Sequence, residues 1–426
     1  MSFETLGLHP KLLQVVTELG YEQPTDVQLQ AIPLALAGDD VMAGAQTGTG
    51  KTAAFALPIL QRLMTLPSLA EQGTEDAKPQ QGAKIRALVI TPTRELAQQV
   101  YDSFIAYGKY SDLNVAVAYG GTSMNVQIKA LRAGVDILIA TPGRLLDHVF
   151  VGNVSLANVE TFVLDEADRM LDMGFIVDIN RIMRRMPVER QTLFFSATFS
   201  KQVKKLAFTI LTDPKMVEVT PENIAADTVQ QMVYPVDKKR KSELLAYLIG
   251  SRNWQQVLVF TKTKQGSDQL AKSLGLDGIK AVSINGDKSQ GARQRALDDF
   301  KAGKVRVLVA TDVAARGLDI QQLEYVVNFD LPFNAEDYVH RIGRTGRAGN
   351  IGNAITLMSL DEEWALKAIE ELLNTRLPQQ WLEGYEPDPS LIETTSVHRG
   401  ASAEKRRAKA KSKVHQNRGK NAQRRR

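Results

Sequence analysis

The sequence of 426 residues contains no cysteine. Disulfides, thiolate zinc sites and cysteine nucleophiles are therefore excluded, and the absence fits a reducing compartment. No run approaches about 18 consecutive apolar residues, so we expect no membrane-spanning helix. The first six residues carry neither a basic segment nor a long apolar stretch, so no signal peptide is expected. These absences predict a cytoplasmic protein without contact to a membrane.

Histidine is also scarce, and charge is unevenly spread. The five histidines lack ligand spacing, so we expect no metal site built on them. Residues 399–426 hold twelve Lys or Arg and one Glu, a net charge of +11, whereas the remaining chain carries −6. Because this tail has almost no large apolar residues, we expect residues 386–426 to be disordered. It would bind nucleic-acid phosphates without reading sequence, or it would only keep the protein soluble.

Short apolar runs recur along the chain with helical patterns between them. Runs that are apolar on both faces are typical of strands buried in a parallel sheet. The predicted strands of the first half are 40–43, 87–91, 115–119, 137–141, 162–165 and 192–196. Those of the second half are 257–260, 281–284, 305–311, 325–329 and 354–357. The alternation predicts an α/β fold with helices on both faces of each sheet.

The repeated alternation indicates two similar domains. Ile137–Thr141 and Val307–Thr311 are nearly the same sequence in the two halves, which favours a duplicated α/β domain. Residues 220–227 lack periodicity and carry a proline, so the linker is placed there. The predicted division is a first domain over 1–219, a linker over 220–227, a second domain over 228–385 and a tail over 386–426. A polar stretch over 67–84 is predicted to be a surface loop.

A glycine-rich loop follows the first predicted strand and precedes a helix over 53–63. In such a loop, backbone N–H groups and the positive helix end bind phosphates, the lysine reaches the β- and γ-phosphates, and the following threonine ligates Mg²⁺. Alanine stands here at the position where the pattern usually has its first glycine. The predicted phosphate-binding residues are Ala45, Gln46, Thr47, Gly48, Thr49, Gly50, Lys51 and Thr52.

The strand over 162–165 ends in the acidic run Asp165, Glu166 and Asp168. Together with the phosphate loop, such a strand end is the minimal set for holding and splitting a Mg²⁺–nucleoside triphosphate. We expect Asp165 to hold Mg²⁺ and Glu166 to orient and deprotonate the attacking water. The predicted cofactors are ATP and Mg²⁺.

With these motifs placed, residues 1–375 resemble the DEAD-box ATP-dependent RNA helicases, which have two tandem RecA-like domains. The matching motifs occur in family order. They are Gly20–Thr25 with Gln28, Pro92–Leu96, Gly120–Gly121, Thr141–Arg144, Asp165–Asp168, Ser196–Thr198, Gln290 with Arg293, Asp312 with Arg316–Asp319, and His340–Arg347. Asp237–Lys241 and Asn253–Val257 make the chain most similar to the bacterial RhlE-type subgroup.

The resemblance implies a role for each matching residue. Phe3 and Gln28 would hold the adenine, Asp319 would contact the ribose, and Arg344 and Arg347 would act as arginine fingers on the γ-phosphate. Asp168, Ser196, Thr198 and His340 would couple ATP to RNA binding. The RNA backbone would be contacted by Thr93, Arg94, Gly121, Thr141, Arg144, Arg293 and Thr311. Such contacts position a strand but do not read its sequence.

The implied activity is ATP hydrolysis coupled to local, non-processive strand separation by a monomer. By family analogy, ribosomal precursor particles or the RNA-degradation machinery are the expected partners besides RNA. Two alternatives stay open at this point. One is a translocase acting on DNA, and the other is an ATP-gated RNA clamp in which hydrolysis only times release.

Overall fold

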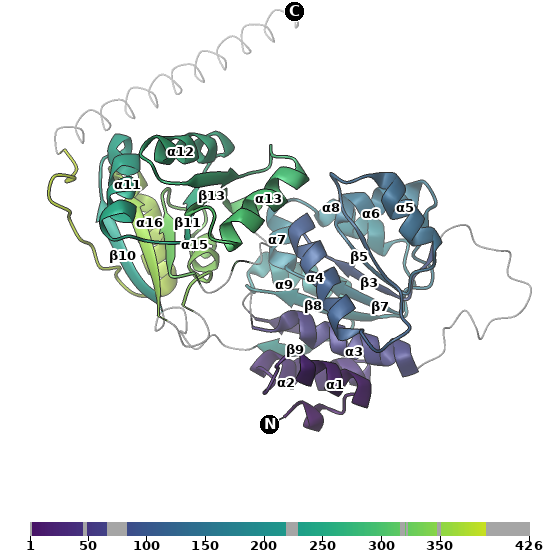
Figure 1. Ribbon diagram of the computed structural model, residues 1–426. Coiled ribbons are helices and arrows are strands. Elements are labelled where there is room, and N and C mark those ends of the chain that lie inside the picture. The colour runs from purple at the N-terminus through teal and green to yellow at the C-terminus, as the bar shows by residue number, and fades with distance from the viewer. Residues whose placement is uncertain are drawn as a thin grey trace, which may run out of the picture.

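The computed structural model describes residues 2–45, 49–65, 83–218, 229–315, 320, 323–346 and 351–388. Within these ranges the chain forms two α/β units, each built on a parallel sheet (Figure 1). The linker predicted over 220–227 and the tail beyond 388 lie outside the described residues. None of the helices in the described ranges is long and apolar enough to cross a membrane.

The first sheet has seven parallel strands in the order β4-β5-β3-β7-β8-β1-β9. Their bounds are β1 Val41–Gly44, β3 Ala87–Ile90, β4 Val115–Ala118, β5 Ile137–Ala140, β7 Thr161–Leu164, β8 Gln191–Ser196 and β9 Lys215–Glu218. Every strand expected from the apolar runs is present. The edge strand β9 was not predicted, because only Val217 in it is buried.

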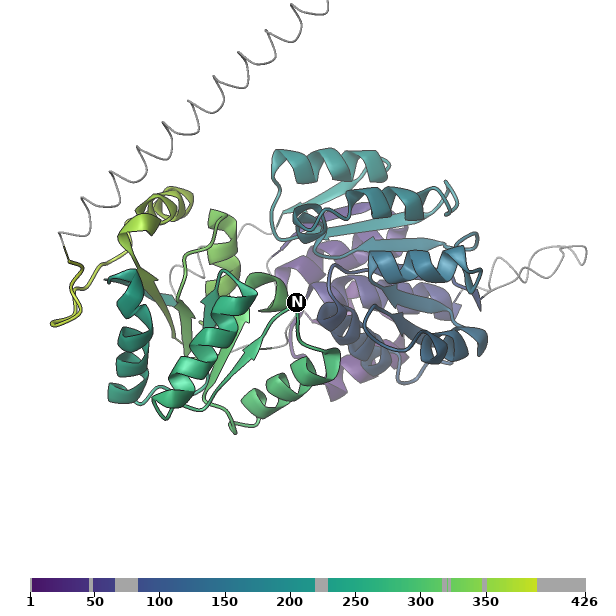
Figure 2. The same cartoon turned by 90° about the horizontal axis from the view of Figure 1, so that it is seen from above.

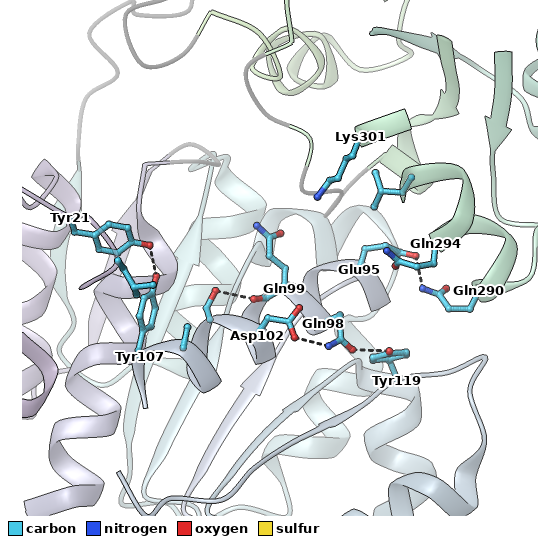
Figure 3. Close-up of a pocket in the computed structure, with 15 residues that line it drawn as sticks. Tyr21, Glu95, Gln98, Gln99, Asp102, Tyr107, Tyr119, Gln290, Gln294 and Lys301 are labelled. Atoms are coloured by element: carbon cyan, nitrogen blue, oxygen red, sulfur yellow. Dashed lines mark hydrogen bonds between the residues drawn. The ribbon is translucent and has the colours of Figure 1, made fainter. Parts of the chain in front are cut away.

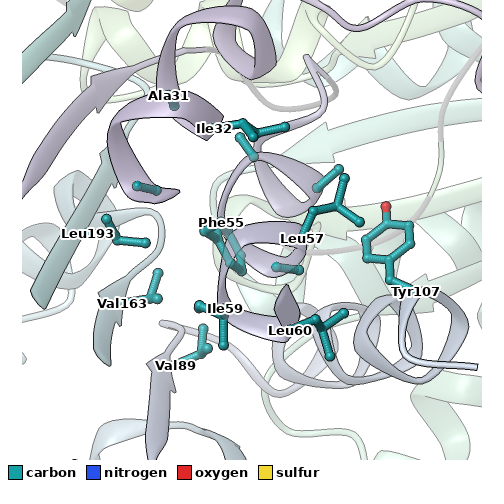
Figure 4. Packing of buried hydrophobic residues seen from close by; sticks show 14 of the residues in the cluster. Ala31, Ile32, Phe55, Leu57, Ile59, Leu60, Val89, Tyr107, Val163 and Leu193 are labelled. Atoms are coloured by element: carbon teal, nitrogen blue, oxygen red, sulfur yellow. The ribbon is translucent and has the colours of Figure 1, made fainter. Parts of the chain in front are cut away.

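Helices cover both faces of this sheet because successive strand residues point to opposite sides. A 3₁₀ turn and four helices pack on one face: η1 Phe3–Leu6, α1 Pro10–Glu18, α2 Asp26–Ala37, α3 Lys51–Thr65 and α4 Arg94–Tyr107. Five helices pack on the other: α5 Met124–Arg132, α6 Pro142–Phe150, α7 Ala167–Asp172, α8 Ile176–Met183 and α9 Lys201–Ile210. In Figure 4, Phe55 of α3 lies among Val89, Val163 and Leu193 from three neighbouring strands.

The second sheet has six parallel strands in the order β10-β15-β14-β11-β13-β12. Their bounds are β10 Val229–Pro235, β11 Val257–Thr261, β12 Ala281–Ile284, β13 Val307–Thr311, β14 Tyr325–Asn328 and β15 Gly352–Met358. Its helices are α11 Lys241–Ser251, α12 Lys264–Leu276, α13 Gln290–Lys301, α14 Asp312–Ala315, α15 Ala335–Ile342 and α16 Glu363–Leu373. Short 3₁₀ turns, η3 Lys238–Arg240 and η4 Leu360–Glu362, precede α11 and α16.

The two sheets share one topology. Read from β4 in the first sheet and from β12 in the second, the strands correspond in order, and β5 falls opposite β13. These are the two strands whose sequences, Ile137–Ala140 and Val307–Ala310, are nearly the same. The predicted fold class, two tandem parallel α/β domains covered by helices, is thereby confirmed.

Two boundaries differ from expectation. Ala83 and Lys84, the end of the predicted loop over 67–84, form strand β2 and pair with β6, Val154–Ser155. The second domain also continues past the expected boundary at 386, because the backbone N–H of Asp388 donates to the carboxylate of Asp237 at 3.2 Å. The domain bounds over 219–228 stay a prediction, since those residues are not described.

Candidate active site and nucleic-acid interface

The phosphate loop begins at the carboxyl end of β1, which is the usual place for a ligand site in a parallel sheet. The N–H of Ala45 donates to the carbonyl of Ser196 at 3.0 Å, which extends the β1–β8 pairing into the loop. Gly50 has a φ of +87°, a value that favours glycine, and Lys51 and Thr52 open α3. Gln46, Thr47 and Gly48 lie outside the described residues. The Lys51 ammonium is buried, and its Nζ has no hydrogen-bond partner among the residues that the structure describes.

An unpaired buried ammonium is costly, so it marks a position where an anion would be stabilised. Lys51 and Thr52 line a cavity of about 480 Å³ together with Asp165 and Glu166. The same cavity continues past Gln28 to Phe3 and Tyr21, whose rings stack with centroids 6.4 Å apart. Of the predicted phosphate-, metal- and adenine-binding residues, one cavity is therefore lined by Phe3, Gln28, Gly50, Lys51, Thr52 and Asp165.

The side chain of Gln28 hydrogen-bonds to the phosphate loop. Its Nε2 donates to the carbonyl of Gly50 at 3.1 Å, and its Oε1 accepts from the backbone N–H of Thr25 at 2.9 Å. The Thr25 hydroxyl donates to the carbonyl of Thr49 at 2.7 Å. Both ends of the Gln28 amide are thus bonded within the protein, so contact with an adenine would require exchange of these bonds.

Asp165 and Glu166 follow β7 directly and are both nearly buried. Burial raises the pKa of Asp165 to about 6, because the charge of Lys51 opposes this shift only in part and Glu166 adds to it. Glu166 has a φ of +55°, a left-handed conformation that strains a non-glycine residue. Asp165 Oδ1 accepts from the Glu166 N–H at 3.0 Å, which holds this turn. No group of three or more acidic or histidine side chains that could bind a metal occurs in the described parts of the chain.

Asp168 links the acidic strand end to the next strand. Its Oδ2 accepts from the hydroxyl of Thr198 at 3.2 Å, and the hydroxyl of Ser196 donates to the Thr198 carbonyl at 2.8 Å. Phe199 lies against the last residue of β1, because a Cβ on Gly44 would come within 2.5 Å of its ring. Ser196, one of the residues predicted to couple ATP to RNA, also accepts the N–H of Ala45 at the start of the loop.

The predicted RNA-contacting residues of the first domain gather at the carboxyl ends of β3, β4 and β5. Thr93 caps α4 by accepting from the Leu96 N–H at 3.3 Å, and Thr141 precedes α6. A Cβ on Gly121 would lie 2.0 Å from a nitrogen of Arg94, so this glycine makes room for the guanidinium.

Gln127 was not predicted from the sequence to have a role at this site, yet its side chain hydrogen-bonds to several neighbouring residues. Its Oε1 accepts from Arg144 Nη1 at 3.0 Å and contacts Nε2 of the buried His148 at 2.8 Å. Its Nε2 donates to the Thr122 hydroxyl at 2.6 Å and to the Tyr119 carbonyl at 2.9 Å. The side chain of Arg144 is therefore held on the loop after β4.

The second domain faces the first with α13 and α15 (Figures 1 and 2). Arg344 is buried, and it lines a small pocket with His340 and with Arg169 from α7. Arg341, three residues before Arg344, instead forms a bidentate ion pair with Asp312 at 2.6 and 2.8 Å. Thr311 ends β13 just before Asp312. Asp319 and Arg347 lie outside the described residues.

Among the described residues, ion pairs join the two domains at two places. Arg169, which follows the acidic run, pairs with Asp337 of α15, and both side chains are nearly buried. Arg293 of α13 pairs with Glu95 of α4 at 2.8 Å, and Gln290 also donates to Glu95, at 3.3 Å. Arg293, predicted to contact RNA, is thus bound to the first domain in this structure. Neither contact could be expected from local sequence patterns.

Beside the Glu95 contact, the domains enclose a cavity of about 690 Å³ (Figure 3). Amide, carboxylate and tyrosine side chains of α4 line one side, and Gln290, Gln294 and Lys301 of α13 line the other. The domains therefore meet through separate polar contacts rather than a continuous apolar surface. Interfaces of this kind permit relative domain motion.

Comparison with known proteins agrees with this architecture. The chain matches the family described as DEAD/DEAH box helicase over residues 25–206 and the helicase conserved C-terminal domain over residues 240–349. A solved structure of Saccharomyces cerevisiae Dbp5 bound to RNA and ADP BeF3 superposes with a TM-score of 0.76 at 29% identity. The superposition covers 93% of this chain and 98% of that one. The fold is thus a two-domain helicase core of the RecA type.

Two bacterial relatives show which helicase family the chain belongs to. The chain is 46% identical to the ATP-dependent RNA helicase RhlB of Pseudomonas aeruginosa, over 88% of this chain and 93% of the relative. It is 41% identical to the DEAD-box ATP-dependent RNA helicase CshA of Bacillus subtilis, over 88% of this chain and 73% of the relative. The chain belongs to the DEAD-box helicase family.

Proposed function

We propose that this protein is an ATP-dependent RNA helicase that couples RNA-stimulated ATP hydrolysis to local unwinding or remodelling of RNA. The observation that carries the proposal is the cavity that Gln28, Lys51, Asp165 and Glu166 line together. The names of the relatives, RNA helicases that use ATP, support the same activity.

In the ATP site, Lys51 would neutralise the β- and γ-phosphates, since its buried ammonium has no hydrogen-bond partner within the described part of the chain. Thr52 and Asp165 supply the hydroxyl and carboxylate oxygens that Mg²⁺ prefers, so these residues fit the metal. When bound, Mg²⁺ would neutralise charge on the phosphate oxygens. The strained turn would hold the Glu166 carboxylate toward the attacking water.

Nucleotide recognition would extend to both ends of the cavity. Phe3 and Gln28 would hold the adenine, with the Gln28 amide exchanging its bonds to Thr25 and Gly50 for bonds to the base. The backbone from Ala45 through Thr49 and Gly50 would bind the phosphates. Asp319 and Arg347, together with Arg344, would complete the site from the second domain. This arrangement makes domain closure a condition for hydrolysis.

RNA would bind across the same two domains. Thr93, Arg94, Gly121, Thr141 and Arg144 would contact the strand from the first domain, and Thr311 and Arg293 would contact it from the second. Since ATP and RNA both bridge the domains, each would tighten the binding of the other. The chain from Asp168 through Thr198 to Ser196 gives this coupling a physical route.

Finer features of the proposal rest on the family alone. The RhlE-type subgroup, a cytoplasmic location, a monomeric state and action on ribosomal precursor particles or in RNA degradation are all part of it. The basic tail over 386–426 would add a phosphate tether.

Hydrolysis of ATP measured without nucleic acid, with RNA and with DNA of the same sequence tests the proposal. Stimulation by RNA alone, abolished in Lys51→Ala, is the expected result. Equal stimulation by DNA would favour the DNA translocase instead. For an RNA clamp, Glu166→Gln should retain the biological role in the locked state, whereas an unwinding enzyme should lose it.

A further inference from the structure

The C-terminal ends of α6 and α8 form an exposed surface that the proposed function does not use. Phe150, on the last turn of α6, is 62% exposed, and Val151 beside it is 71% exposed. Large apolar side chains that stay exposed together on a protein of this size are typical of an interaction site. Helix α6 packs against α8, so the two ends lie side by side (Figure 1).

An arginine packs on this phenylalanine, and a second arginine precedes the first in the sequence. The Arg185 guanidinium lies over the Phe150 ring, 4.8 Å from its centroid, and Arg184 and Arg185 are both exposed. Neither has an ion-pair partner among the described residues, whereas Arg181 pairs with Asp178 at 3.4 Å. Arg184 and Arg185 therefore present two adjacent, exposed positive charges just after α8.

We propose that Phe150, Arg184 and Arg185 form an accessory site for unpaired RNA nucleotides that flank the predicted RNA track. This inference rests on the proposed function, because Thr141 and Arg144 of that track lie at the N-terminal end of the same helix. From Arg144 to Phe150 the helix rises about 9 Å. At about 3.4 Å per nucleotide, a strand leaving Arg144 along α6 would reach the phenylalanine within roughly three nucleotides.

The exposed ring and the arginines would bind single-stranded RNA rather than a duplex. A ring exposed on one face and held by an arginine on another offers a flat surface to a base, and only an unpaired base can stack on it. The two unpaired guanidiniums would contact the neighbouring phosphates. Base stacking on aromatic residues tolerates any sequence, so the site would lengthen the bound segment without selecting a target.

RNA affinity measured against strand length tests this inference in the full-length protein with a non-hydrolysable ATP analogue. We compare strands of about 6 and about 12 nucleotides, the shorter filling only the core track. Phe150→Leu should weaken binding of the longer strand about tenfold, leave the shorter strand unaffected and leave its stimulation of ATP hydrolysis unchanged. Phe150→Tyr should bind like the wild type. Phe208→Leu, at a residue of α9 that is 58% exposed, is the matched control and should change neither affinity.

The arginines and the stacking have separate readouts. Arg184→Gln combined with Arg185→Gln should reduce the salt dependence of binding by about 0.7 in log–log slope for each phosphate that is no longer neutralised. A 2-aminopurine placed along the longer strand should be quenched at one position by the wild type and by Phe150→Tyr, but not by Phe150→Leu.

The outcomes separate the accessory site from the proposed function. If RNA stimulates ATP hydrolysis but the longer strand binds no tighter, or if its gain depends on residues 399–426 and not on Phe150, the accessory site is refuted alone. Equal losses in Phe150→Leu and Phe208→Leu would refute it as well. If neither strand binds or stimulates hydrolysis, the proposed RNA helicase activity itself is wrong.

Discussion

The ion pair between Arg169 and Asp337 should control how strongly ATP tightens RNA binding. It joins α7, directly after the acidic run, to α15, which carries His340. Both side chains are nearly buried in this arrangement and would be hydrated if the domains separated. The pair therefore stabilises the closed state and contributes little to the folding of either domain.

The expected size of the effect follows from burial. Truncating one partner of a buried, hydrogen-bonded charge pair at an interface costs about 2 to 5 kcal/mol. The lower end applies to Asp337→Ala, because Arg169 keeps a second carboxylate, Asp172, at 3.3 Å. A loss of about 2 kcal/mol corresponds to a factor of about 30 in affinity. We therefore expect Asp337→Ala to bind RNA about 30-fold more weakly with a non-hydrolysable ATP analogue.

Fluorescence anisotropy of a labelled RNA, with and without the analogue, measures this effect. Binding without nucleotide and the urea midpoint of unfolding should stay unchanged, because the open state does not use the pair. The double variant Arg169→Ala/Asp337→Ala should lose little more than either single variant. Lys367→Ala is the matched control, since Lys367 forms an exposed pair with Glu363 in the same domain. A coupling energy near zero, or equal losses with and without the analogue, would refute a role in closure.

Three further predictions concern the first domain. Gly121→Ala should displace the Arg94 guanidinium, which would lie 2.0 Å from the new Cβ, and weaken RNA binding at least several-fold; normal affinity measured by anisotropy would contradict the close approach. Lys51→Ala should abolish ATP hydrolysis while the thermal midpoint stays the same or rises, because the buried ammonium has no hydrogen-bond partner among the described residues; calorimetry showing a large destabilisation would contradict this reasoning. Burial lowers the pKa of His148 below 6.5, so the unfolded chain takes up this proton first and stability should fall as the pH decreases below about 6.5. Urea midpoints at pH 7.5 and 5.5 should differ less in His148→Gln than in the wild type, and an equal difference would exclude His148, which contacts Gln127, as the cause.

Much of the fold could be predicted because buried parallel strands are continuous apolar runs. Ala87–Ile90 and Val257–Thr261, for example, are buried at every position, so their sequences alone indicate central strands. The helix that begins at Arg94 was also predictable, since Thr93 caps it and apolar residues recur at helical spacing. In the edge strands Lys215–Glu218 and Val229–Pro235, polar residues interrupt the pattern, and both were missed.

The sequence by itself also determined the chemistry of the site. The phosphate loop and the acidic strand end are local motifs, because a few consecutive residues at the end of one strand do each task. Their convergence on one cavity follows from the parallel sheet, where all carboxyl ends meet at one edge.

Only the tertiary structure decided which side chains are already engaged. Arg293 pairs with Glu95, the Gln28 amide bonds to Gly50, and Arg169 meets Asp337 across 168 positions of sequence. Such contacts depend on how two separately folded domains approach each other, and a long-range ion pair leaves no periodicity in the chain. The physical reason is that local patterns encode backbone conformation and burial, whereas domain closure depends on pairwise charges that only the assembled molecule brings together.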